Sequence, residues 1–221
     1  MYKTKYDDGF HAYLVEDATF VGNPPMPALM DLKNVQIPKD IIPFDKAKHA
    51  KNKRQYVHFY MHDNQFIGAL TATKSYVNLL KQFDGVITPD CTMLINQFDY
   101  LQQTNTYFNR AVGFYLQKQG IPVIPNIRWS DESSFKYCFT GVPKDSIVSI
   151  STHGCIHRKD LREMFKIGLD AMLNELTPTD VLVHGRMPDD IFEKYSNQVN
   201  FHRYASQFER AHQKDGNAYG N

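Results

Sequence analysis

The chain has 221 residues, of which 42% are hydrophobic and 13% aromatic, and its 25 basic and 24 acidic residues leave a net charge of +1. This length fits one large domain with a sizeable core. A charge so close to zero argues against a surface built to bind long nucleic acids, which requires many phosphates to be neutralised. No run of about 18 apolar residues is present, so we expect no membrane-spanning helix.

The cysteines indicate a reducing compartment. Cys91, Cys138 and Cys155 are odd in number and include no CxxC pair, so a disulfide framework is not expected. The first residues contain acidic side chains and lack the apolar segment of a signal peptide. We therefore expect a cytoplasmic protein.

Residues 1–55 differ from the rest in their proline content. Five of the eleven prolines of the chain fall here, at positions 24, 25, 27, 38 and 43. Proline lacks a backbone donor and biases the preceding residue to extended conformations. We predict an irregular arm that wraps the domain. Its basic run at 46–54 is interpreted as a solvated linker, with a phosphate-contacting segment as the alternative.

From residue 56 to residue 206, apolar strand-like segments alternate with helix-like segments. Strands are expected at 56–63, 84–90, 121–129, 146–154, 181–185 and 199–204. Helices are expected at 73–83, 104–119, 159–176 and 188–195, followed by a polar tail at 207–221 that should fray.

This alternation predicts a single α/β domain with a mainly parallel sheet covered by helices. Two arrangements fit: a TIM-barrel-like fold, incomplete or distorted, and an open doubly wound sheet. In both, the loops at the carboxyl ends of the strands build the functional site.

Two residues at expected strand ends are candidates for catalysis. Asp90 follows the second strand and His184 ends the fifth. A carboxylate and an imidazole can divide acid and base work near neutral pH. The structural alternative for Asp90 is a helix N-cap.

A second group of residues is expected to bind a ligand. The candidates are Asn126, Arg128, Trp129, Arg186 and Arg110. The arginines suit phosphate or carboxylate groups, Asn126 can orient a ligand, and Trp129 can stack on a base or sugar. Trp129 could equally be a core residue. Arg110 could neutralise Asp90, but its helix could also serve as a structural brace.

The segment THGCIH suggests a further alternative. His153, Cys155 and His157 lie close together in sequence, and such residues can bind zinc or iron. The spacing matches no established metal motif, and Cys155 could instead be a nucleophile or a structural thiol. Nucleotide-binding and hydrolase motifs such as GxGxxG, GxxxxGK[ST] and GxSxG are missing from the sequence. No cofactor is predicted, and a divalent metal is left open.

Several long strings carry a resemblance to a known family. They are PFDKAKH, FDGVITPD, NTYFNR, IPVIPNIRWSDESSF and CFTGVPKDSIVSISTHGC. In order and over roughly residues 40–185, they resemble a family of uncharacterised bacterial and phage-borne proteins, domain of unknown function 4417. The resemblance implies carriage by phages, plasmids or integrated elements, and hence the host cytoplasm if the protein is phage-encoded. It implies no activity and no catalytic residues.

The leading functional hypothesis is a hydrolase that acts on a phosphorylated or nucleotide-like substrate. The first alternative is a non-catalytic binder that sequesters a nucleotide signal or a host or phage protein. The second is a replication accessory that contacts DNA through residues 46–54. The sequence does not fix an oligomeric state.

Overall fold

The structure is a computed structural model that describes residues 11–31 and 35–211. Its strands are β1 (Phe20–Val21), β2 (Met26–Pro27), β3 (Ile41–Pro43), β4 (Tyr56–His58), β5 (Gly85–Ile87), β6 (Val123–Ile124), β7 (Ile147–Ser151), β8 (Asp180–His184) and β9 (Asn200–Tyr204). The helices are α1 (Phe44–Ala47), α2 (Ile67–Thr71), α3 (Thr73–Leu80), α4 (Asp99–Lys118), α5 (Phe135–Cys138), α6 (Lys159–Leu176) and α7 (Asp189–Phe192). Short 3-10 turns lie at η1 (Ala12–Val15), η2 (Asp63–Gln65), η3 (Glu132–Ser134) and η4 (Glu193–Tyr195).

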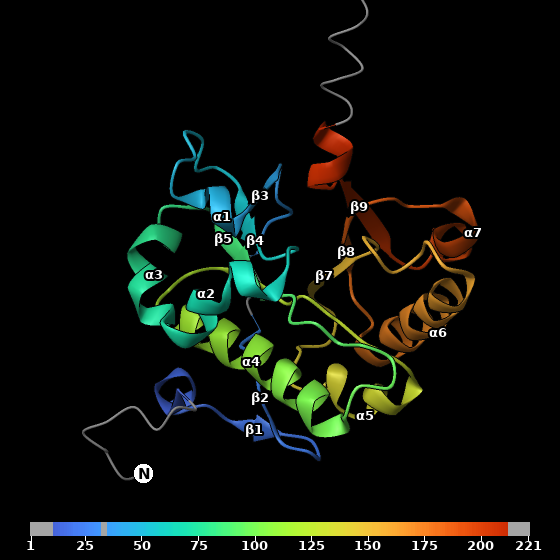
Figure 1. The fold of residues 1–221 in the computed structure, drawn as a ribbon, viewed down its shortest axis with the longest axis horizontal. Helices are drawn as coiled ribbons and strands as arrows, with labels where there is room; N and C mark the ends of the chain where they lie inside the picture. Colours follow the sequence, from blue (N-terminus) through green and yellow to red (C-terminus); the bar gives the residue numbers. More distant parts are fainter. Residues whose placement is uncertain (1–10, 32–34, 212–221) are drawn as a thin grey trace, which may run out of the picture.

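Two parallel sheets form the centre of the molecule (Figure 1). One has the order β3-β4-β5-β6 and the other β7-β8-β9. A single bridge between Asn126 and Ser149 joins them beyond the end of β6, with Ser149 N donating to Pro125 O at 2.8 Å. Each strand from β3 to β9 therefore lies next to its predecessor in the chain. The predicted α/β class with parallel sheets is confirmed.

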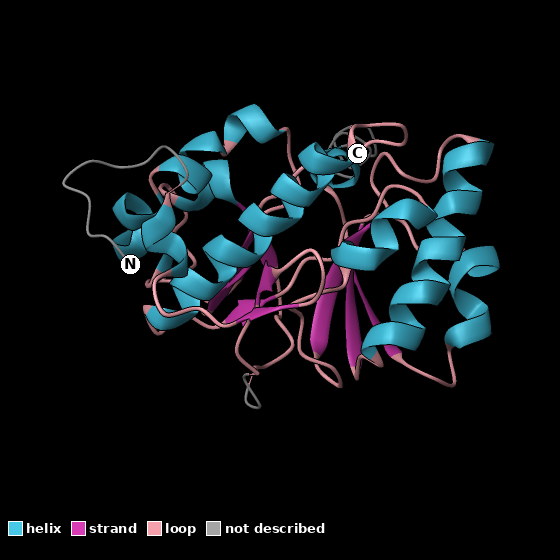
Figure 2. Cartoon of the chain, turned by 90° about the horizontal axis from the view of Figure 1, so that it is seen from below, coloured by secondary structure: helices cyan, strands magenta, loops and turns pink. Residues whose placement is uncertain are grey.

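The two faces of the strands have different partners, because side chains alternate along a strand. Val57, Val86 and Val123 pack into a core with the helices α1 to α4, and Val148 and Val183 pack into a core with α5 to α7. On the opposite face, residues from six strands pack against one another: Ile41, Tyr56, Ile87, Ile124, Leu182 and Tyr204. Figure 2 shows the strands in the interior with helices on either side.

The longest helices follow the apolar periodicity of the sequence. α6 has the predicted bounds, and its C-cap residue Thr177 adopts a left-handed conformation. α4 begins five residues before its predicted start, because Asp99 opens it and Gln102 is buried in its first turns. No helix in the described ranges is both long and apolar enough to cross a lipid bilayer.

The proline-rich arm is more ordered than its composition suggests. Leu14 is buried in the helical core, and Met30 exchanges two hydrogen bonds with the side chain of Gln117 on α4. The hairpin of β1 and β2 also lies along α4 (Figure 1). The first parallel strand, β3, lies inside this arm, and its three residues are too few to show a sequence pattern. Of the polar tail, residues 207–211 form a helical turn, and the rest lies outside the described residues.

The outer edge of β3 has little capacity to accept another strand. The N–H of Ile41 donates to the carboxylate of Asp40 at 2.9 Å, and Pro43 has no N–H. Side-chain contacts, instead of strand pairing, connect this edge to the last strand: Tyr204 Oη donates to Pro38 O at 2.5 Å, and Arg210 pairs with Asp40 at 2.7 Å. The parallel array therefore ends at β3.

Candidate functional site

A layer of polar side chains follows the apolar layer toward the carboxyl ends of the strands. Two residues beyond Ile124 is Asn126, and two beyond Leu182 is His184, so each pair shares one strand face. The described members of this layer are His58, Tyr60, Asn126, Ser149, Ser151 and His184, all of them buried. The local alternation of the sequence thus places a polar network at the carboxyl ends of the strands.

One part of this region, which we call the open cluster, consists of Asp90, Asn126, Arg128 and Cys155. The amide Nδ2 of Asn126 donates to Asp90 Oδ1 at 2.8 Å. Arg128 Nη1 lies 3.7 Å from Asp90 Oδ2 and donates to Cys155 Sγ at 3.2 Å. The structure therefore brings together three of the residues singled out from the sequence, Asp90, Asn126 and Arg128.

The guanidinium of Arg128 has unused hydrogen-bonding capacity. Its Nε and Nη2 atoms have no partner among the described residues, and its side chain is 25% exposed. The pKa of Arg128 is raised by its contacts with Cys155 and Asp90, so the group stays charged. A charged donor with free N–H groups suits an anionic ligand.

Burial shapes the acid chemistry of the open cluster. It raises the pKa of the Asp90 carboxyl, while Arg128 and the Asn126 hydrogen bond act in the opposite direction. Burial also raises the pKa of the Cys155 thiol. Asp90 thus has an increased proton affinity, and burial disfavours the thiolate form of Cys155, whereas Arg128 acts in the opposite direction.

The other part, which we call the closed cluster, consists of His58, Tyr60, Ser149, Ser151 and His184. The Tyr60 hydroxyl donates to Asn126 Oδ1 at 3.1 Å and shares a 2.5 Å hydrogen bond with Ser149 Oγ. Its ring stacks on the imidazole of His184, with 4.4 Å between the ring centroids. Asn126 therefore connects the two clusters, since its amide nitrogen contacts Asp90 and its amide oxygen contacts Tyr60.

The imidazoles of the closed cluster are neutral. Burial lowers the pKa of His184 to about 3 and also lowers that of His58. His184 Nδ1 lies 3.1 Å from Ser151 Oγ, while its Nε2 is the one buried side-chain nitrogen or oxygen in the described residues without a hydrogen-bond partner. Among the described residues, no hydrogen bond joins His184 to Asp90 or Arg128. The catalytic role of His184 stays a prediction.

Arg110 lies behind the site on α4 and holds backbone in place. Its Nε donates to Thr140 O at 3.0 Å and its Nη2 to Cys138 O at 2.6 Å, and its side chain is almost completely buried. The neighbouring Asn109 donates to Pro89 O at 2.7 Å and to Asn126 O at 3.0 Å. These contacts match the interpretation of Arg110 as part of a structural brace, so the proposed site does not include Arg110.

Trp129 points to the helical side of the sheet. It is 8% exposed and lies 5.2 Å from the ring of Phe165 on α6. It sits over Gly168, where a Cβ atom would lie only 2.0 Å from the indole nitrogen. Only glycine at this position leaves room for the indole. Trp129 is thus a core residue that also forms one wall of a cavity.

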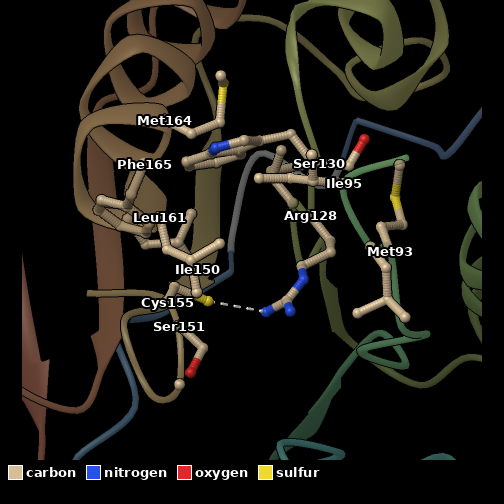
Figure 3. Close-up of a pocket in the computed structure, with 14 residues that line it drawn as sticks. Met93, Ile95, Arg128, Ser130, Ile150, Ser151, Cys155, Leu161, Met164 and Phe165 are labelled. Atoms are coloured by element: carbon tan, nitrogen blue, oxygen red, sulfur yellow. Dashed lines mark hydrogen bonds between the residues drawn. The ribbon is translucent and has the colours of Figure 1, made fainter. Parts of the chain in front are cut away.

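This cavity adjoins the open cluster and has a volume of about 130 Å³. Its apolar walls include Met93, Ile127, Trp129, Ile150, Leu161 and Phe165. Arg128 is the one charged residue among the described residues that line it, and Ser151 and Cys155 lie beside it. Figure 3 shows Leu161 and Phe165 on one side, Met93 on the other, and the Arg128 guanidinium between them.

The remaining candidates line a different cavity, although the carbonyl of His153 also accepts a hydrogen bond from Cys155 Sγ of the open cluster at 3.5 Å. His153, His157 and Arg186 line a separate cavity of about 220 Å³ next to Glu209. In the described residues, no three His, Cys, Asp or Glu side chains are arranged to hold a metal ion. His153, Cys155 and His157 therefore do not form the metal site that their spacing allowed.

Comparison with known proteins places the chain in a family. The family described as Domain of unknown function (DUF4417) matches residues 20–204. The chain belongs to the DUF4417 family. The resemblance noted in the sequence is thus confirmed.

Curated relatives of this DUF4417 chain come from phages. It is 30% identical over 158 residues to the Gene 1 protein of Mycobacterium phage L5, covering 68% of this chain and 69% of the relative. It is 28% identical over 131 residues to the Gene 1 protein of Mycobacterium phage D29, covering 59% of this chain and 48% of that protein. No solved structure matches the chain. It is thus similar to phage proteins.

Proposed function

We propose that this DUF4417 chain is an enzyme that acts on a small phosphorylated or nucleotide-like substrate at the open cluster, with hydrolysis as the reaction class. One observation carries the proposal. A carboxylate of raised pKa, Asp90, lies 3.7 Å from an arginine, Arg128, whose remaining donors are free beside an apolar cavity. Such a combination is typical of catalytic sites.

Three members of the open cluster have a role in the proposal. Asp90 transfers the proton, because its increased proton affinity brings it closer to working pH. Arg128 binds the anionic group of the substrate through Nε and Nη2. Asn126 orients the carboxylate through its 2.8 Å hydrogen bond.

We also propose that the strands from β3 to β9 form an incomplete barrel. Their neighbours follow chain order, whereas a doubly wound sheet reverses its order at a switch point. Six of these strands contribute to one apolar cluster, and Tyr204 reaches from β9 to Pro38 before β3. A barrel of this kind would carry its site at the carboxyl ends of the strands.

The enzyme proposal is tested with a panel of nucleotides and sugar phosphates, followed by detection of products by mass spectrometry. Asp90→Asn should reduce turnover by about 100-fold or more while the substrate still binds. Asp84→Asn is the matched control, since Asp84 is exposed at the opposite end of the same strand, and it should retain wild-type turnover. Equal turnover in both variants would refute the role of Asp90.

A non-catalytic binder is the second candidate. It is favoured by the absence of any hydrogen bond from a described imidazole to Asp90, which leaves the carboxylate without an evident proton-transfer partner. In that case a ligand should bind saturably and remain unchanged, and Asp90→Asn should alter only its affinity.

The DNA-binding alternative stays a prediction. Two residues of the basic run are engaged within the chain, Lys46 with Gln207 and Lys53 with the carbonyl of Ala47. Lys48, Lys51 and Arg54 are exposed. If this segment binds DNA, affinity should fall steeply with salt and fall further when these three side chains are neutralised.

A further inference from the structure

We infer that the cavity beside Arg128 binds one aromatic ring, and that the same ligand places an anionic group, phosphate or carboxylate, on the Arg128 guanidinium. This inference deepens the proposed function, on which it rests for the location of the ligand. It holds whether or not the ligand is chemically altered there.

The size of the cavity limits the ligand to one ring. Its volume is about 130 Å³, close to the roughly 150 Å³ of an engineered apolar cavity in another protein that binds benzene. A single six-membered ring or nucleobase fits this space, whereas a complete nucleotide does not. The rest of a larger ligand must lie outside, over Arg128 and Asp90.

The walls of the cavity suit a planar, weakly polar group. Trp129 and Phe165 pack against each other, with 5.2 Å between their ring centroids, and both line the cavity. A ligand ring packs well against an aromatic wall of this kind. Met93 and Met164 contribute flexible thioether side chains from opposite sides (Figure 3), and sulfur makes favourable contacts with ring edges.

Charge determines how the ligand is oriented. Among the described lining residues, Arg128 alone is charged, and its Nε and Nη2 are free to donate. The carboxylate of Asp90 forms an ion pair with Nη1 at 3.7 Å, which is longer than a hydrogen bond, so Nε and Nη2 remain available to a ligand. A ring with an attached oxyanion therefore complements both the apolar walls and the free donors.

The chain contains two built-in reporters for this cavity. Trp129 is its single tryptophan, so intrinsic fluorescence reports on one wall. Cys155 also lines the cavity and is partly exposed, whereas Cys91 and Cys138 are buried. The rate of thiol labelling in the folded protein therefore reports on access to Cys155.

The test is a fluorescence titration with phenyl phosphate, which joins a ring to a phosphate, and with two fragment-sized probes, benzyl alcohol as an uncharged ring and inorganic phosphate as the anion. Phenyl phosphate should saturate the Trp129 signal, slow the labelling of Cys155, and bind at least about tenfold more tightly than either fragment. Parallel titrations with uridine monophosphate and phenylacetate distinguish a nucleotide from an aryl carboxylate as the preferred class.

Three variants make the result specific, and two of them form a matched pair. Arg128→Met should weaken phenyl phosphate by about tenfold or more and leave benzyl alcohol unchanged. Leu161→Phe should narrow the cavity and weaken ring binding. Ile167→Phe adds the same bulk to an exposed position of the same helix, outside the cavity, and should bind as the wild type does.

The inference is overturned if phenyl phosphate leaves both reporters unchanged up to about 10 mM, or if inorganic phosphate alone binds equally well. The proposed function fails differently. If ring binding persists in the wild type and in Asp90→Asn but the wild type turns over no phosphorylated compound, catalysis is refuted while the ligand class stands.

Discussion

The open and closed clusters are joined through Asn126 but differ in charge and in exposure. In the closed cluster, Tyr60 is hydrogen-bonded to Asn126 and Ser149 and stacked on His184. The imidazoles of this cluster are neutral. In the open cluster, Arg128 is charged and has two nitrogens without partners in the described chain. Polar groups that are buried with their partners define a structure, whereas free charged donors are available to a ligand.

Two arginines express this contrast most directly. Arg110 and Arg128 both lie near the strand ends, but Arg110 is 1% exposed and donates to backbone carbonyls, while Arg128 is 25% exposed and lines a cavity. The same side chain thus supports the fold in one place and forms a candidate site in the other.

The largest expected effect is a difference in unfolding free energy between variants of these two arginines. Arg110→Met should lower the free energy of unfolding by about 3 kcal/mol or more, because it leaves the buried carbonyls of Cys138 and Thr140 without donors. Arg128→Met should change it by less than about 1 kcal/mol. Urea denaturation measures the free energy of unfolding of both variants. Similar losses in the two variants would contradict the distinction between a structural Arg110 and a ligand-binding Arg128.

The second prediction concerns the pH dependence of the closed cluster. The pKa of His184 is about 3 in the folded chain and about 6.5 when unfolded, so the unfolded state binds more protons between these values. Stability should therefore fall as the pH drops below 6.5, by about 1.4 kcal/mol per pH unit for this histidine. His184→Phe should reduce that slope between pH 4.5 and 6, and an unchanged slope would contradict the burial of a neutral imidazole.

The third prediction concerns the hydrogen bond between Tyr60 and Asn126 that connects the two clusters. Tyr60→Phe removes the hydroxyl that bonds Asn126 and Ser149 and should cost about 1–2 kcal/mol in unfolding free energy. Because Asn126 also holds Asp90, we expect turnover to fall as well, while ring binding beside Arg128 is retained. Loss of stability without any effect on turnover would show that the closed cluster serves the fold alone.

The smallest effect is a gain in stability. The pKa of Asp90 is raised on folding, so its charged form is disfavoured in the folded state and the associated stability is present at low pH and lost as the pH rises. Asp90→Asn should thus stabilise the protein by up to about 1 kcal/mol at pH 7.5 and by less at pH 4. Thermal unfolding at the two pH values checks this, and a loss at pH 7.5 would indicate that Asp90 stabilises the fold.

Much of the fold could be predicted because it depends on local patterns. The apolar runs at β7 and β8 and the apolar stripe of α6 are read directly from the sequence. β3 escaped prediction since it is only three residues long and lies among prolines. The sheet's division after β6 also has no local signal, because strand pairing depends on distant segments.

The candidate site was predictable only in part. Asp90, Asn126 and Arg128 were expected to converge because they follow neighbouring strands, and the structure brings them together. Tyr60 was missed as a site residue, although its position two residues after His58 places both on one strand face. The contact between Arg128 and Cys155 depends on how two loops pack, which no spacing in the sequence encodes.

The edge of β3 has a consequence for the behaviour of the protein in a crowded cell. With the Ile41 N–H capped by Asp40 and with proline at position 43, this edge lacks the backbone donors that a strand from a neighbouring molecule would need for regular pairing. Open parallel arrays are prone to such intermolecular growth, which leads to fibrils. Three residues at the start of the array thus disfavour strand addition at this edge, independently of anything that happens at the carboxyl-end site.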